Sequence, residues 1–147
     1  MLFRSRGAQL ARYDFVEREI EGERLDGGGW SRVTLRVANV LPYVVLKIFA
    51  FQDRHENKDA YDLVFTLLNA KGGAQQAGRA AAASTVARHA QVTEALKLLE
   101  DRFRDATQDG PAAFAAFLIT DENDMARLRQ QAAATVRAFL EGLHQQR

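Results

Sequence analysis

The stretch that decides the fold spans residues 32–52 and reads RVTLRVANVLPYVVLKIFAFQ. In its first part, Val33, Leu35 and Val37 alternate with polar side chains, which is the period of a half-buried strand. After Pro42 the apolar residues follow the period of a helix, and they are dense enough for a mostly buried one. The change of period therefore predicts a strand that leads into a buried helix.

A second alternating stretch, with Val16 and Ile20 on the same side, lies upstream of the first. One aspartate and three glycines, residues 26–29, separate the two stretches. Glycine adopts the positive φ angles that tight turns between strands require. We predict an antiparallel β-hairpin over residues 13–40, with a bulge at Gly22 in its first strand.

A row of carboxylates, at Glu17, Glu19 and Glu21, occupies the polar side of the first predicted strand. One interpretation is a comb of ligands for metal ions. The other is a solvated face whose charges are balanced across the ladder by Arg32 and Arg36. The second interpretation is favoured because strands with one exposed face alternate in this way by default. We therefore predict no metal site.

The rest of the chain is rich in alanine and has the apolar spacing of helices. The predicted segments are a helix that begins at Asn57 or Lys58 and ends near Leu68, a helix or mobile loop over residues 75–83, a helix over residues 84–104, a short helix over residues 112–118, and a last helix capped by Thr120 or Asp121. The predicted fold class is α+β, with a small antiparallel sheet followed by a helical bundle. The chain is predicted to be one domain over residues 1–147, with a flexible arm at 1–12, the hairpin at 13–40 and the helical region at 41–147.

Composition excludes several classes of function. The 147 residues include no cysteine, which rules out disulfides, thiol catalysis and thiolate metal sites. Arg4, Arg6 and Arg12 form a basic N-terminal arm, but no aromatic residues are interleaved with them for base stacking, so nucleic-acid binding is not expected. No apolar run approaches the roughly 20 residues of a membrane-spanning helix. We predict no membrane partner and a cytoplasmic location.

Five charged residues around the end of the predicted buried helix carry the most information about function. Lys47 interrupts an apolar helix, and a buried ammonium is costly unless it is paired. Arg54 lies two helical turns further on, and Lys58, Asp59 and Asp62 open the next helix. In one interpretation the aspartates pair with Arg54 and Lys47 and lock two helices together. In the other, the cations bind the phosphates of a nucleotide. No nucleophile lies in this segment, so catalytic residues stay unknown.

The same residues resemble a known signature. The pattern Lys47-x-x-Ala50-x-x-x-Arg54-x-x-x-Lys58-Asp59-x-x-Asp62-Leu63 is similar to the K…R…(K/R)D-x-x-D-L signature of bacterial nucleotidyltransferases of the AbiEii/AbiGii toxin type, in the polymerase-β-like superfamily. The resemblance implies that Lys47, Arg54 and Lys58 face the phosphates of a nucleotide. It also implies that Asp59 and Asp62 order the pocket.

The sequence lacks the Gly-Ser and D-x-D motifs with which that family holds its catalytic metal ions. The expected function is therefore a truncated nucleotidyltransferase-like protein that does not catalyse alone and binds a nucleotide or a partner. One alternative is an interaction module that forms a homodimer, or complements a separate N-terminal half, through an exposed hairpin edge. Another is an active transferase that uses Mg²⁺ and a nucleoside triphosphate, with Glu17, Glu19 or Glu21 and Asp26 as its carboxylates. Only this last alternative requires a cofactor.

Overall fold

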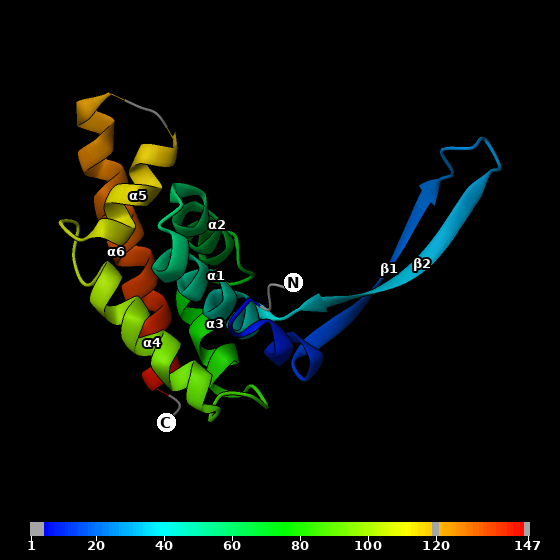
Figure 1. Cartoon of the computed structure of the whole chain (residues 1–147), viewed down its shortest axis with the longest axis horizontal. Coiled ribbons are helices and arrows are strands. Elements are labelled where there is room, and N and C mark those ends of the chain that lie inside the picture. The colour runs from blue at the N-terminus through cyan, green and yellow to red at the C-terminus, as the bar shows by residue number, and fades with distance from the viewer. Residues whose placement is uncertain (1–4, 119–120, 146–147) are drawn as a thin grey trace.

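The computed structural model describes residues 5–118 and 121–145. The predicted α+β class is confirmed, because an antiparallel pair of strands precedes a set of packed helices (Figure 1). In chain order the elements are the 3-10 helix η1 (Ala8–Arg12), the strands β1 (Phe15–Glu23) and β2 (Trp30–Ala38), and the helices α1 (Val40–Arg54), α2 (Asn57–Leu68), α3 (Gly73–Ala82), α4 (Ala90–Phe103), α5 (Asp109–Leu118) and α6 (Glu122–His144).

The hairpin of β1 and β2 projects away from the helical body as a long arm (Figure 1). Its register is continuous from the Phe15–Ala38 pair at the base to the Glu23–Trp30 pair near the tip. The predicted bulge at Gly22 is wrong, because this residue pairs with one residue only, Ser31, and no extra residue enters the ladder.

The base of the hairpin is joined to the body by short connections and by hydrogen bonds. Asn39 alone separates β2 from α1. Its backbone N–H donates to the carbonyl of Asp14 at 3.2 Å, and its side-chain amide donates to the Asp14 carboxylate at 2.7 Å. The hydroxyl of Ser84 donates to the same carboxylate at 2.6 Å. The first strand is therefore tied both to the start of α1 and to the loop after α3.

Residues 5–12 differ from the flexible arm predicted over residues 1–12, of which residues 1–4 lie outside the described residues. Leu10 in η1 is buried in the core, and the backbone of Gly7, at φ 81°, passes close to Val45. Arg6 donates hydrogen bonds to Asp53 at 3.1 Å and to Glu94 at 2.9 Å. The segment is held because an apolar side chain enters the core. Arg4 lies outside the described residues.

The helical body is built around α6, which packs against α3, α5 and α4, while α1 packs between α2 and α4. The core takes its side chains from all six helices and from η1, with Phe49, Phe103, Phe114 and Phe139 as its largest buried members. None of the helices within the described residues has the length and the apolar character that crossing a bilayer requires.

The helices α3 and α6 approach each other at two glycines. A Cβ atom added at Gly78 would lie 2.0 Å from the carbonyl oxygen of Phe139, and one added at Gly142 would lie 2.0 Å from that of Gln75. Only residues without a side chain allow two backbones to pack this closely. This contact resolves the ambiguity over residues 75–83 in favour of a helix.

One helix start differs from the prediction, and one predicted cap is confirmed. The predicted helix over residues 84–104 begins only at Ala90, because residues 85–88 form a turn. The ring of His89 caps the helix by accepting from Gln91 N–H at 3.2 Å. The predicted alternative of a cap at Asp121 is confirmed for α6, since its carboxylate accepts from Asp124 N–H at 2.9 Å. Thr120 lies outside the described residues.

Candidate functional site

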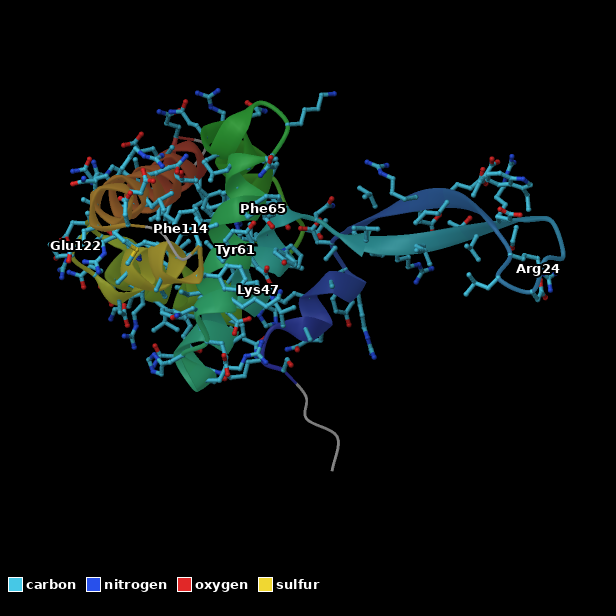
Figure 2. The ribbon with its side chains drawn as sticks, turned by 90° about the horizontal axis from the view of Figure 1, so that it is seen from above. Arg24, Lys47, Tyr61, Phe65, Phe114 and Glu122 are labelled. Carbon is cyan, nitrogen blue, oxygen red and sulfur yellow. The ribbon has the colours of Figure 1, made fainter. Side chains whose placement is uncertain are left out.

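The five charged residues predicted to act together meet where α1 turns into α2. Lys47 and Arg54 project from α1, and Lys58, Asp59 and Asp62 project from α2 (Figure 2 labels Lys47). Only residues 55 and 56 separate the two helices, so α2 folds back against the last turns of α1. This arrangement brings the cations of α1 into contact with the aspartates of α2.

Asp59 is the centre of this network and is only 1% exposed. Its carboxylate accepts two hydrogen bonds from the guanidinium of Arg54, at 2.7 and 2.8 Å, and one from the ammonium of Lys47 at 3.3 Å. Asp62 accepts from Lys47 and from Lys58, both at 2.7 Å. A buried carboxylate with this many charged donors fixes the positions of both helices.

The pKa values of the network follow from these contacts. Burial by itself raises the pKa of Asp59, but the hydrogen bonds from Arg54 and Lys47 outweigh that effect, so the pKa lies below its ordinary value. The pKa of Asp62 is lowered in the same way by Lys47 and Lys58, against the effect of its burial. Burial would lower the pKa of Lys47, but the hydrogen bond to Asp62 reverses the direction and raises it. All three groups are therefore held in their charged forms.

A hollow of about 500 Å³ opens beside the network, lined by Ser5, Arg6, Leu46, Lys47, Ala50, Asp53 and Arg54. The cations that line the hollow already have partners. Arg6 is paired with Asp53 and Glu94. Lys47 and Arg54 are both paired with Asp59. Four cations here face four carboxylates: Arg6, Lys47, Arg54 and Lys58 against Asp53, Glu94, Asp59 and Asp62. The interpretation as an ion-pair lock matches these contacts, and phosphate binding stays a prediction.

The glutamate row on β1 is paired across the hairpin, as the favoured interpretation required. Arg32 lies 3.3 Å from Glu19 and also pairs with Glu21, and Arg36 lies 3.5 Å from Glu17. All of these side chains are more than half exposed. Within residues 5–118 and 121–145, no group of three or more acidic or histidine side chains is arranged to hold a metal ion.

Sequence reasoning missed the opposite face of the hairpin. Its apolar members are Val16, Ile20, Val33, Leu35 and Val37, which we call the apolar hairpin face. Four of them, all but Val16, are between 45% and 54% exposed. The alternation in the sequence identified which side chains share this face. It could not show that no helix covers them.

A second exposed apolar group lies on α2 and α5. Tyr61 stacks against Phe65 and Phe114, with ring centroids 5.5 and 6.0 Å away. Figure 2 labels these three residues. The ring of Phe117 lies 4.5 Å from that of Tyr61 and is tilted against it. Phe65 is 48% exposed and Phe117 is 37% exposed, whereas Phe114 belongs to the core. The helical spacing of Tyr61 and Phe65, one turn apart, was the only signal in the sequence for this group.

Comparison of the chain with protein-family models, with characterised proteins and with solved structures finds no match.

Proposed function

We propose that this protein is an interaction module whose hairpin docks onto another protein chain. The observation that carries the proposal is the apolar hairpin face, which is solvent-exposed on an arm that projects from the body (Figures 1 and 2). A contiguous apolar surface on a well-folded protein is a common mark of a protein interface. The hairpin adds nothing to the core of its own chain beyond its base, so its length needs another explanation.

The energetics of the hairpin support the proposal. A two-stranded hairpin without a third strand or a covering helix is only marginally stable in water. Its ion pairs on the polar face are exposed, and each such pair contributes about 0–1 kcal/mol. Covering the apolar face would remove Ile20, Val33 and Leu35 from water and would stabilise the ladder as well. Docking is therefore expected to strengthen the pairing of β1 with β2.

Site-specific photocrosslinking in cells of the protein's native organism tests this proposal. A photoreactive benzoylphenylalanine in place of Leu35, on the apolar face, is expected to give protein adducts in high yield. The same group in place of Thr34, the next residue on the polar face, is expected to give at least tenfold less adduct. Equal yields from the two positions would contradict the proposal, because a docking surface must distinguish the two faces.

Nucleotide binding, as the resemblance to nucleotidyltransferases implies, is a second candidate function. The observation that favours it is the hollow beside Lys47, whose lining includes Arg6 and Arg54. An anion there has to compete with the carboxylates that already pair with these cations, so binding is expected to be weak, with a dissociation constant near the millimolar range, and sensitive to salt.

Titration calorimetry with ATP measures this binding. In the Arg54→Gln variant Lys47 still pairs with Asp59, and a phosphate site is expected to lose most of its heat of binding. Lys97→Gln on α4, which lies outside the lining of the hollow, is the matched control and should bind as the wild type does. Absence of heat from the wild-type protein at millimolar ATP would rule out this second function.

A further inference from the structure

We propose that the chain that covers the apolar hairpin face is a second copy of this protein, stacked face to face with its hairpin running in the opposite direction. This inference rests on the proposed docking function and names the occupant. Three features of the hairpin support it: the charges on its edges, the order of residues on its face, and the reach of its tip.

The charges on the polar side disfavour pairing of two copies through the hairpin edges. Antiparallel pairing of β1 with a second β1 would place Glu17, Glu19 and Glu21 beside the same residues of the other copy. Pairing of β2 with a second β2 would place Arg32 beside Arg36. Like charges at neighbouring positions of a sheet are destabilising. Pairing through either edge would create such a row of like charges, whereas stacking through the apolar hairpin face would not.

The order of residues on the apolar hairpin face is nearly the same in both directions. The middle pair is Arg18 with Leu35, and it is flanked by Val16 with Val37 toward the base and by Ile20 with Val33 toward the tip. In a reversed stack about a two-fold axis at this middle pair, each β-branched pair meets the other β-branched pair of the second copy. A surface that complements itself in this way is what a symmetric dimer requires.

Arg18 is the one charged side chain on this face, and it limits the strength of the stack. Its guanidinium donates to the carbonyl of Glu17 at 3.4 Å and pairs with no carboxylate among the described residues. Because β1 is an edge strand, the stem of Arg18 can lie against the stack while its charge stays in water. The two copies of Arg18 still approach each other across the axis. The dimer should therefore tighten with salt, which screens this repulsion.

The reversed stack also accounts for the tip of the arm. Nine residues of strand span about 30 Å, so a hairpin face about 10 Å wide offers roughly 300 Å² per copy, well below the roughly 800 Å² of a standard interface. The axis lies closer to the base than to the tip, so the tip reaches the base of the second hairpin. Leu25, in the turn at the tip, is fully exposed. Trp30 is 76% exposed but pairs with Glu23 and lies on the same side of the ladder as Arg32, so it faces away from the stack. At the base, a hollow of about 590 Å³ is lined by Val40, Leu41, Ala77 and Ala81 among others. Contact between the turn at Leu25 and this hollow adds to the area of the stack.

Disulfide trapping tests this geometry directly, because the natural chain has no cysteine. In the proposed stack the Leu35→Cys thiols of the two copies lie beside each other across the axis. Mild oxidation is therefore expected to crosslink the Leu35→Cys protein into a dimer at least tenfold faster than the Thr34→Cys protein, whose thiol lies on the polar face. A mixture of Val33→Cys and Val37→Cys proteins is expected to form the mixed dimer faster than either protein crosslinks alone. Equal rates for Leu35→Cys and Thr34→Cys would overturn the proposal.

Sedimentation equilibrium of proteins without cysteine gives an independent measurement. Leu35→Glu is expected to raise the dimer dissociation constant at least a hundredfold, and Arg18→Ser is expected to lower it about tenfold. A wild-type protein that stays monomeric at millimolar concentration would overturn the inference. If photocrosslinking at Leu35 then gives adducts with a different protein, the docking function stands and only the occupant is wrong. If it gives none, both fail.

Discussion

Replacement of Gly142 by alanine is expected to destabilise the protein by about 3 kcal/mol or more, the upper end of the effects of overpacking. The added methyl group would lie 2.0 Å from the carbonyl oxygen of Gln75 on α3. The nearest atoms belong to a helix backbone, so no side-chain rotation relieves the contact and the two helices must move apart. Unfolding in urea measures the loss as a lower midpoint.

Gly22→Ala provides the control for this prediction. Gly22 lies in a strand, has no positive φ angle, and has no atom within 4 Å of the position that a Cβ would take. Alanine there should change the free energy of unfolding by less than about 1 kcal/mol, in the stabilising direction, because it restricts the unfolded chain. Equal midpoints for the two variants would mean that α3 and α6 are not in close contact.

Replacement of Asp59 by alanine is expected to cost about 3–5 kcal/mol, the range found when one partner of a buried ion pair is removed. The variant leaves Lys47, whose side chain is mostly buried, without one of its two carboxylates, and it frees Arg54. Lys58→Gln removes a cation of the same network that is 65% exposed, and its cost should stay below about 1 kcal/mol. Denaturant unfolding of both variants makes the comparison.

The dependence of this loss on pH identifies its cause. The pKa values of Asp59 and Asp62 are lowered in the folded protein, so the stability that they contribute is complete above the unfolded value of about 3.9. It is lost as the pH falls below that value and through the folded pKa values. The wild type should therefore approach the Asp59→Ala variant in acid. A difference between the two proteins that stays constant from pH 7 to pH 3 would point to packing instead of charge.

Much of the fold could be predicted from local patterns. The period of two before Asn39 and the helical period after it identified β1, β2 and α1, because a strand and a helix expose their side chains at different spacings. The ion pairs between α1 and α2 could also be foreseen as one of two interpretations. A lysine within an apolar helix needs a partner, and Asp59 and Asp62 at the start of the next predicted helix were suitable acids.

The remaining features depend on contacts between distant parts of the chain. Gly78 and Gly142 are ordinary residues in the sequence, and only the crossing of α3 and α6 makes them necessary. Leu10 is one leucine in a basic segment, and only the shape of the core decides that it is buried. The apolar hairpin face is exposed because the hairpin projects away from the helices (Figure 1). The alternation of residues within a strand does not indicate whether a helix covers one of its faces.

The attachment of the hairpin determines the entropy of any association that it makes. Asn39, Asp14 and Ser84 tie the first strand to two parts of the body, and no flexible linker lies between β2 and α1. The direction of the arm is therefore set during folding, and its rotational freedom has already been given up before a partner arrives. An arm on a loose tether would lose that freedom on binding, so the same contact area yields a tighter complex here.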